Sequence, residues 1–345
     1  MKNKIYLIRS GKTNFGGAEN YLLRLKNVLE TREIEHEIIT SPLPNFLPSW
    51  VRALLFNVYL IFIKKNKFFY SLDRITCPDL YRAGDGVHKT FLSIEKKSRL
   101  NLLHPTYIYL EKRCFKNAKS IITNSKMVKD EIIQTYKINP KKINVIYNGI
   151  ELKTMNNFES FEKLSKEFPI YKKHQIILFV GSGFKRKGVE QFLGIFAKIK
   201  NRDLIAFIIG KESNMNFYHK LAKKLKIDSK VFFTGPRIDV DDFYTISDIL
   251  LFPTHYDPFS NVVLEAMNFG NVVFTTCNNG AKEILDKNFI MESPFDLSVI
   301  SKIEFLLGNK VALNKEKETN KKISQQFSIE KNLEKTLEII NKIEY

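Results

Sequence analysis

The chain has 345 residues, of which 44% are hydrophobic and 27% are charged. This composition is typical of folded globular proteins and excludes an intrinsically disordered chain. Its 55 Lys and Arg residues against 37 Asp and Glu give a net charge of +18. We therefore expect anionic partners (phosphate esters, an anionic membrane surface or nucleic acid), although a Lys-rich genome also explains such an excess. At about 150 residues per domain, the length predicts two domains.

The cysteines and the apolar segments bear on the cellular compartment. Three unevenly spaced cysteines without a CxxC pair predict a reducing environment, with neither a disulfide framework nor a zinc site. The N-terminal residues lack the apolar length and cleavage site of a signal peptide. Pro48, Arg52 and Asn57 interrupt the most apolar segment, residues 46–63, so a buried or interfacial helix is expected there. We expect a cytoplasmic protein.

Short β-rich runs alternate with helical patterns along the chain. In the first half, strands are predicted at 4–8, 36–40, 119–125 and 143–150, and helices at 18–32 and 126–136. In the second half, strands are predicted at 175–181, 203–210, 230–235, 248–254 and 271–276, with helices at 187–200, 215–226, 239–247 and 261–269. This order predicts βαβ units with buried parallel sheets, in two Rossmann-like α/β domains.

A polar stretch near 150–170 separates the two α/β halves. The predicted domains are residues 1–160, residues 161–325 and a C-terminal helix at 326–345. The tail has apolar residues at the spacing of an amphipathic helix, namely Phe327, Ile329, Leu333 and Leu337. Ligand loops at the carboxyl ends of the strands of two such domains are expected to enclose a cleft.

Residues 11–20, GKTNFGGAEN, follow the first predicted strand and open the first predicted helix. Gly16 and Gly17 permit a close backbone approach, and a helix N-terminus offers free N–H groups to a phosphate. The segment is neither a GxGxxG nor a Walker motif. An ordinary turn between a strand and a helix is therefore an equal alternative to a phosphate site.

Residues 180–188, VGSGFKRKG, also follow a predicted strand and bring Arg186 and Lys187 to the start of the next predicted helix. Cations are unfavourable at a helix N-terminus, so two of them there indicate a compensating anion such as a diphosphate. A solvated basic turn is the alternative.

Residues 254–270, THYDPFSNVVLEAMNFG, contain two acids eight positions apart, Asp257 in a loop and Glu265 in the following helix. Ser260 is the expected N-cap of that helix, and the amides of 259–261 are expected to be free. Carboxylates accept pairs of hydrogen bonds from sugar hydroxyls, so the pattern fits a polyol beside a phosphate. A capping acid and an unrelated surface Glu fit the spacing equally well.

Residues 81–92, YRAGDGVHKTFL, hold Asp85 and His88 in a loop flanked by glycines. Together in such a loop they are candidates for substrate contact. The alternative is a turn aspartate beside a structural histidine.

Taken jointly, these motifs resemble the retaining glycosyltransferases of family 4, which have the GT-B fold. The resemblance covers nearly the whole chain. It rests on GGAEN (16–20), NSKMVKDEI (124–132), VIYNGIE (145–151), VGSGFKRKG (180–188), FTGPRIDVDDFYTISDILLFPT (233–254) and DPFSNVVLEAMNFGNVVFTT (257–276). The last of these has the family's paired acids at the usual interval, with Asp257 in place of the commoner Glu. That variant, together with FVGSGFKRKG and YRAGDGVH, is similar to the lipopolysaccharide core glucosyltransferase I subgroup.

The resemblance implies a GT-B α/β fold whose C-terminal helix returns to the N-terminal domain, and it implies roles for particular residues. Glu265 would hold the donor ribose, Asp257 would hold the transferred sugar, and Arg186 and Lys187 would stabilise the leaving diphosphate. The other implied donor contacts are Gly16, Gly17, Ser182, Gly183, Arg237, Ile238, Pro258, Phe259, Ser260 and Asn261. Asp85 or His88 would stand where relatives carry a histidine, and the choice between these two residues is open.

The implied reaction is hexosyl transfer with retention of anomeric configuration and without a metal or cofactor, since no DxD motif lies at a suitable strand end. Fixed cations and helix N-termini would stabilise the charge that develops on the diphosphate. UDP-glucose is the favoured donor, with GDP-mannose, UDP-galactose and ADP-heptose as alternatives. Because Asp replaces Glu at position 257, a non-catalytic sugar-nucleotide-binding homologue is also possible.

Residues 88–117 carry seven Lys and Arg against two Glu, with aromatic and aliphatic residues among them. Such a segment suits an anionic membrane surface, where each cation adds about 1 kcal/mol. We therefore expect a lipid-linked or lipopolysaccharide-core acceptor at the inner leaflet, and a peripheral location at the inner face of the cytoplasmic membrane. Nucleic acid is not expected, because no recognised nucleic-acid-binding module accompanies the charge.

Overall fold

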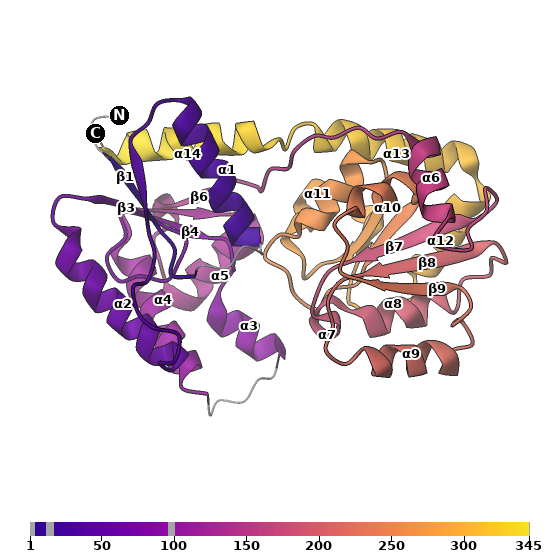
Figure 1. The fold of residues 1–345 in the computed structure, drawn as a ribbon, viewed down its shortest axis with the longest axis horizontal. Coiled ribbons are helices and arrows are strands. Elements are labelled where there is room, and N and C mark those ends of the chain that lie inside the picture. The colour runs from indigo at the N-terminus through magenta and orange to yellow at the C-terminus, as the bar shows by residue number, and fades with distance from the viewer. Residues whose placement is uncertain (1–3, 12–16, 96–100, 345) are drawn as a thin grey trace. The chain divides into compact units, whose positions relative to one another are not determined.

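A computed structural model describes residues 4–11, 17–95 and 101–344. The chain forms two compact units, each with one six-stranded sheet. Unit 1 comprises Met1–Gly149 and Ile329–Tyr345, and unit 2 comprises Ile150–Ser328 (Figure 1). The last segment of the chain therefore belongs to the same unit as the first.

In unit 1 the strands are all parallel and follow the order β2-β1-β3-β4-β5-β6. The strands are β1 (Ile5–Ile8), β2 (His36–Ile39), β3 (Phe68–Ser71), β4 (Leu80–Ala83), β5 (Ser120–Thr123) and β6 (Ile143–Val145). The helices are α1 (Gly17–Thr31), α2 (Ser49–Lys64), α3 (His88–Glu95), α4 (Leu103–Asn117), α5 (Lys126–Tyr136) and α14 (Ile329–Glu344). Strands β3 and β4 are not among the predicted elements, because short strands buried on both faces lack the alternation that marks a half-buried strand.

The middle of the unit 1 sheet is buried, since every residue of β3, β4 and β5 is buried. Helices α1 and α14 lie side by side (Figure 1), and Leu25 of α1 shares one core cluster with Leu333, Leu337 and Ile340 of α14. These contacts use the apolar spacing seen in the sequence of the tail. Phe327 is an exception, because α14 begins two residues after it.

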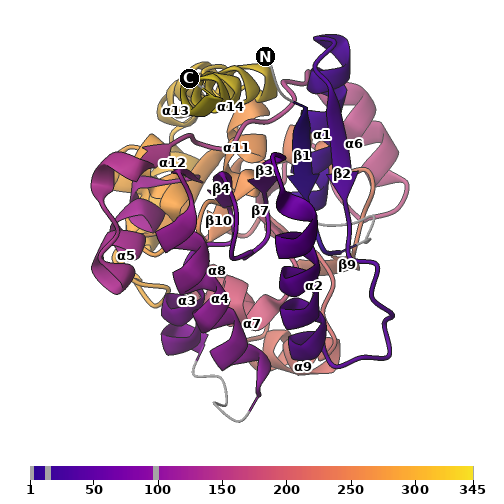
Figure 2. The same ribbon diagram turned by 90° about the vertical axis from the view of Figure 1, so that its left-hand side faces the viewer.

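Helix α2 lies beside α4 in unit 1 (Figure 2). Its inner residues, Phe56 and Leu60, join Ile8, Phe69 and Ile75 in a second core cluster. The predicted helix at 46–63 is therefore confirmed. Within the described part of the chain, no helix is both long enough and apolar enough to cross a bilayer.

In unit 2 the strands are again all parallel, in the order β12-β11-β10-β7-β8-β9. The strands are β7 (Gln175–Val180), β8 (Leu204–Ile209), β9 (Val231–Gly235), β10 (Ile249–Phe252), β11 (Val272–Thr276) and β12 (Ile290–Met291). The helices are α6 (Asn157–Ser165), α7 (Phe184–Lys187), α8 (Val189–Phe196), α9 (Met215–Lys224), α10 (Val240–Ile246), α11 (Asn261–Asn268), α12 (Val299–Gly308) and α13 (Lys310–Ser324).

The helix predicted at 187–200 is observed as α8, which is shorter than predicted, and Gly188 separates it from the short helix α7. Gly188 has a φ of 83°, and a Cβ atom there would lie 1.9 Å from the carbonyl oxygen of Pro253. Only glycine accepts both the left-handed backbone and this close approach. The break holds the end of α7 against the loop that follows β10.

Candidate functional site

In unit 2 the loops after β7 and β8 are tied together at the carboxyl end of the sheet. The Gly183 amide donates to the Lys211 carbonyl at 3.2 Å, and the Lys211 amide donates to the Ser182 hydroxyl at 3.0 Å. At Gly210, a Cβ atom would lie 2.1 Å from the Gly181 carbonyl oxygen. Ser182 and Gly183 therefore belong to a rigid turn at the edge where open α/β sheets bind ligands.

Lys187 and Asp257 form an ion pair at the same edge of the sheet. The Ser260 hydroxyl donates a second hydrogen bond to the same Asp257 oxygen. The two charged side chains are 14% and 9% exposed, and the Lys187 ammonium lies 5.1 Å from the centre of the Phe252 ring. A cation and a carboxylate that are distant in sequence thus meet in a nearly dry environment.

The pKa values of this pair are shifted by burial and by charge. Burial alone would raise the pKa of the Asp257 carboxyl, but the Lys187 ammonium and the hydrogen bonds from Lys187 and Ser260 outweigh it, and the pKa falls below its ordinary value. Burial lowers the pKa of Lys187, and Asp257 offsets only part of that effect while Arg186 adds to it. An additional anion beside Lys187 would therefore stabilise its charged form.

Arg186 and Lys187 directly precede Gly188, the N-cap of α8, as the sequence predicted, and they also end the four-residue helix α7. Cations are favourable at a helix C-terminus. The Arg186 guanidinium donates to the Tyr256 carbonyl at 2.9 Å, and the Arg186 carbonyl accepts from the His255 amide at 2.9 Å. Moreover, Asp257 supplies Lys187 with an anion from within the protein. The placement of these cations thus needs no external diphosphate to explain it.

Ser260 occupies the position before α11, but its side chain makes no capping hydrogen bond. Its hydroxyl donates to Asp257 instead, and its amide donates to the side-chain oxygen of Asn279 at 3.3 Å. The prediction that Ser260 is the N-cap residue of this helix is confirmed in position, although the side chain makes no capping hydrogen bond, and the prediction of a free amide at residue 260 is wrong. Phe259 is buried, and Asn261 begins α11 directly after this turn.

The loop after β11 contributes residues that the sequence did not single out. The Asp257 amide donates to the Asn278 carbonyl at 3.0 Å, and the Gly280 amide donates to the Asp257 carbonyl at 2.9 Å. The Asn279 side chain is fully buried. The turn-forming sequence Asn-Asn-Gly at 278–280 was the available signal, but turn chemistry alone does not reveal a role in holding Asp257.

Glu265, half-buried on α11, accepts a hydrogen bond from the Tyr244 hydroxyl of α10 at 3.1 Å. Burial, followed by the negative charge of Glu265, raises the pKa of Tyr244, so Tyr244 stays protonated and donates. Asp257 and Glu265 thus have different partners: a cation and a hydroxyl hold the first, and a tyrosine holds the second. Pro258 lies in the loop between Asp257 and α11.

Arg237 and Ile238 follow β9. The Arg237 guanidinium makes a bidentate contact with Glu167, at 2.6 and 2.8 Å, and contacts Asp239 at 2.8 and 2.9 Å. The hydrogen bond from Arg237 lowers the pKa of Asp239 to about 2. Ile238 is fully exposed beside these ion pairs. Base contact by Arg237 and Ile238 stays a prediction.

In unit 1, Asp85 lies in the exposed turn after β4, and His88 begins α3. A carboxylate oxygen of Asp85 lies 3.7 Å from a guanidinium nitrogen of Arg74. The Nε2 atom of His88 lies 3.2 Å from the Nδ1 atom of His104, so one ring donates to the other. Gly17 begins α1 in the same unit, whereas Gly16 lies outside the described residues.

Glu111 of α4 fixes the start of α3. Its fully buried carboxylate accepts from the His88 amide at 2.9 Å, from Arg74 Nε at 2.9 Å and from the Tyr136 hydroxyl at 2.7 Å. Glu111 is one of the two acids in segment 88–117, which the sequence suggested as a basic surface. The inner face of α4, including Cys114 and Phe115, is buried, so only part of that segment is available to a partner.

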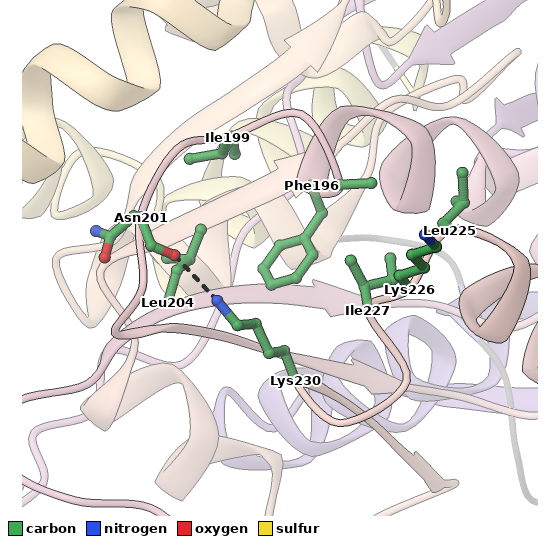
Figure 3. A pocket seen from close by; sticks show the side chains of 9 residues that line it. Phe196, Ile199, Asn201, Leu204, Leu225, Lys226, Ile227 and Lys230 are labelled. Carbon is green, nitrogen blue, oxygen red and sulfur yellow. Dashed lines mark hydrogen bonds between the residues drawn. The ribbon is translucent and has the colours of Figure 1, made fainter.

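The cavity drawn in Figure 3 lies at the opposite end of the unit 2 sheet from Lys187 and Asp257. Its volume is about 180 Å³, and it is lined at the amino ends of β8 and β9 by residues that include Phe196, Leu204, Ile227 and Lys230. Lys230 spans its rim to the Asn201 carbonyl. Parallel sheets bind ligands at the opposite end of their strands, so we do not assign this cavity to the site.

In residues 4–11, 17–95 and 101–344, no group of three or more His, Cys, Asp or Glu side chains is arranged to hold a metal ion.

Both the sequence and the fold of this chain are similar to those of known proteins. The family model for glycosyl transferases group 1 matches residues 160–342, and the model for glycosyltransferase family 4 matches residues 82–154. An uncharacterized glycosyltransferase of Methanocaldococcus jannaschii, MJ1607, is 30% identical over 48% of this chain and 44% of its own length. The lipopolysaccharide glucosyltransferase WaaG of Escherichia coli is 28% identical over 65% of this chain and 63% of its own length. The matched region thus spans less than two thirds of either relative.

Solved structures match over nearly the whole chain. A crystal structure of WaaG covers 97% of the chain, with a TM-score of 0.82 and 20% identity over 99% of that protein. Anabaena HepE in complex with UDP-glucose covers 98% of the chain and 99% of HepE, with a TM-score of 0.75 and 18% identity. These matches confirm the predicted GT-B fold class. Because a family model covers more than half of the sequence, the protein belongs to the glycosyl transferases group 1 family.

Proposed function

We propose that the protein is a retaining glycosyltransferase that moves a hexose, glucose in the first instance, from a uridine diphosphate donor to a lipid-linked or lipopolysaccharide-core acceptor. The family supports the reaction class. The structural similarity to HepE, which is described in complex with UDP-glucose, supports the choice of donor. The similarity to WaaG, a lipopolysaccharide glucosyltransferase, supports the choice of acceptor class. GDP-mannose, UDP-galactose and ADP-heptose are the alternative donors.

The observation that carries the proposal is the Lys187–Asp257–Ser260 cluster at the carboxyl end of the unit 2 sheet. In glycosyl transfer, the bond from the anomeric carbon to the diphosphate breaks, and its electron pair leaves with the diphosphate. The pKa of Lys187 is lowered by burial, so a diphosphate beside it would strengthen its charged form. A fixed, nearly dry cation stabilises such developing charge without reorganisation of solvent.

The remaining roles follow from chemistry. Arg186 would add a second positive charge near the leaving group. Asp257 and Glu265 would accept hydrogen bonds from sugar and ribose hydroxyls, since a carboxylate oxygen accepts more than one hydrogen bond. Asp85 or His88 would contact the substrate in unit 1, and the choice between them stays open. We propose that the reaction needs no metal, that the donor nucleotide is a substrate and not a cofactor, and that the protein acts at an anionic membrane surface.

A donor-resolved transfer assay tests the proposal. The full chain is incubated in EDTA with each labelled nucleotide sugar and a detergent extract of lipid-linked glycans, and the lipid phase is counted. We expect UDP-glucose to label the lipid, and Glu265→Gln to lower the rate about 10²- to 10³-fold. Glu318→Gln, which changes an exposed acid on α13, is the matched control.

The outcomes separate the alternatives. Donor binding without transfer or hydrolysis from any of the four donors would identify a non-catalytic homologue and overturn the proposal. Activity that appears only when a divalent cation is restored would overturn its metal-independent form. Inverted configuration in the product, measured by proton NMR of the anomeric coupling, would overturn the retaining mechanism.

A further inference from the structure

Helix α2 of unit 1 is apolar on both its inner and its outer side. The inner side is buried through Phe56, Asn57 and Leu60. The outer side exposes Leu55, Val58, Tyr59, Ile61 and Phe62, from 38% at Tyr59 to 76% at Phe62. Residues 55, 58, 59 and 62 follow the spacing of one helical stripe, and we call the five residues the α2 outer face. A helix that is hydrophobic on all sides is normally enclosed by protein or lipid, so we expect a binding partner to cover the α2 outer face.

The charges around the α2 outer face indicate what covers it. From residue 38 to residue 72 the sequence has no Asp or Glu, whereas it has Arg52, Lys64, Lys65 and Lys67. Lys65, exposed at the end of α2, lies directly beyond the apolar stripe, and Arg52 lies near its start. Lys64 is paired with Asp79, so Arg52 and Lys65 are the cations that flank the face. An apolar face with cations at its ends complements an anionic bilayer, where the face enters the acyl boundary and the cations meet the headgroups.

Two further features of unit 1 support a lipid partner over a protein partner. Phe46, in the loop that leads into α2, is 84% exposed, and Trp50 and Tyr59 place amphipathic rings on the same helix, as at many membrane interfaces. Helix α4, beside α2, exposes Tyr109, Lys112 and Arg113. Apolar and basic groups are thus concentrated on neighbouring helices.

We propose that the α2 outer face is a membrane-docking surface that inserts into the headgroup region of anionic bilayers. The inference rests on the proposed function only for its purpose, which is to bring the enzyme to a lipid-linked acceptor. It differs from the expectation drawn from segment 88–117, because the apolar side chains of α2 supply the insertion and charge supplies only the attraction.

The single tryptophan of the chain, Trp50, is a built-in reporter at the start of α2. The full-length protein is mixed with phosphatidylcholine vesicles containing about one quarter phosphatidylglycerol, and with pure phosphatidylcholine vesicles. We expect the Trp50 emission to shift to the blue and to be quenched by brominated lipid in the anionic vesicles. Unchanged emission with flotation intact would place the contact elsewhere and overturn the inference.

The substitution test compares two exposed apolar pairs. Val58→Ser combined with Phe62→Ser changes the α2 outer face, and we expect it to lower vesicle partitioning about tenfold or more. The control combines Phe305→Ser and Val311→Ser, which are equally exposed in unit 2, and should leave partitioning unchanged. Circular dichroism melts show whether both variants fold. Equal loss in both, or no loss in either, would overturn the inference.

Two more measurements keep the inference separate from the proposed function. If the wild type fails to bind vesicles but hydrolyses a nucleotide sugar, only the docking surface is wrong. If it binds vesicles through α2 but transfers no sugar, only the proposed function is wrong. The alternative partner for the α2 outer face is a second copy of the chain, which light scattering detects. A dimer that Phe62→Ser dissociates, with no vesicle binding by the wild type, would make this face a contact between copies and overturn the inference.

Discussion

Each unit buries a carboxylate beside a cation, but the two carboxylates are held in different ways. In unit 1, Glu111 accepts from Arg74, from the His88 amide and from the Tyr136 hydroxyl, and its side chain is fully buried. In unit 2, Asp257 has Lys187 and the Ser260 hydroxyl, and both charged side chains keep some exposure. The first arrangement joins four segments of unit 1, whereas the second joins two loops at a sheet edge.

The choice of cation matters as much as the number of partners. An Arg guanidinium presents a rigid fork that suits a permanent tie, whereas a Lys ammonium is a mobile point charge with three donors. Glu111 therefore holds the fold at the start of α3, whereas under the proposed function Lys187 offers its donors to the diphosphate. Four substitutions test this contrast.

The largest effect is expected from Glu111→Ala. The change leaves Arg74 buried without its main partner, which costs about 3 to 5 kcal/mol of unfolding free energy. Urea unfolding followed by circular dichroism measures it. Glu334→Ala, which breaks the exposed pair with Arg32, is the control and should cost about 1 kcal/mol or less. Equal losses in the two variants would remove the distinction between a structural tie and a surface pair.

Lys187→Met should act mainly on activity. Loss of the cation is expected to lower turnover about 10²- to 10³-fold, because the leaving diphosphate loses a fixed charge. Lys185→Met changes an exposed lysine two residues away in the same helix and is the control. Turnover is measured with saturating donor. If Lys187→Met unfolds the protein as readily as Glu111→Ala while the folded fraction keeps its rate, the unit 2 pair is structural too.

Tyr244→Phe tests whether Glu265 depends on the hydrogen bond from Tyr244. Removal of a hydrogen bond to a charged group costs about 1.5 to 3 kcal/mol, and we expect most of this cost in donor binding, measured by calorimetry as a rise in Kd. The fold should be retained, because the ring stays. Tyr218→Phe, buried on α9, is the matched control. An unchanged Kd would show that the tyrosine does not position Glu265 for the donor.

The smallest effect concerns Asp239, whose hydrogen bond from Arg237 lowers its pKa from an ordinary 3.8 to about 2. A lowered pKa in the folded state stabilises the fold at pH values above 3.8, and this contribution disappears as the pH falls from 3.8 to about 2. Asp239→Asn should therefore lower the melting temperature at neutral pH, and the difference from the wild type should vanish near pH 2. Asp228→Asn, an exposed acid, is the control; a difference that persists unchanged at pH 2 would contradict the ion-pair explanation.

Local sequence patterns determined much of the fold. Apolar spacing and turn residues predicted strand β7, helices α5 and α11, and the apolar side of α14 that packs in the core of unit 1. This is possible because burial imposes a period of about 2 on strands and 3.6 on helices. The segments after strands that carry Ser182, Arg186 and Asp257 were also identifiable, since each of them follows a predicted strand. The four-residue strands β3 and β4, and the break at Gly188, escaped this reasoning because their cause lies in neighbours that the local pattern does not contain.

Only the tertiary structure decided which charged groups meet. Lys187 and Asp257 are 70 positions apart, and Arg74 and Glu111 are 37 apart. The strand order of unit 2 places β10 directly beside β7, so the loops that follow these strands lie together. The order of the predicted elements indicated that a cation and two acids follow strand ends, with Asp257 in a loop and Glu265 in the helix after it. The packing of the elements decided that Asp257 forms an ion pair with Lys187 and that Glu265 accepts a hydrogen bond from Tyr244. Such partners depend on adjacency in space and not on distance along the chain.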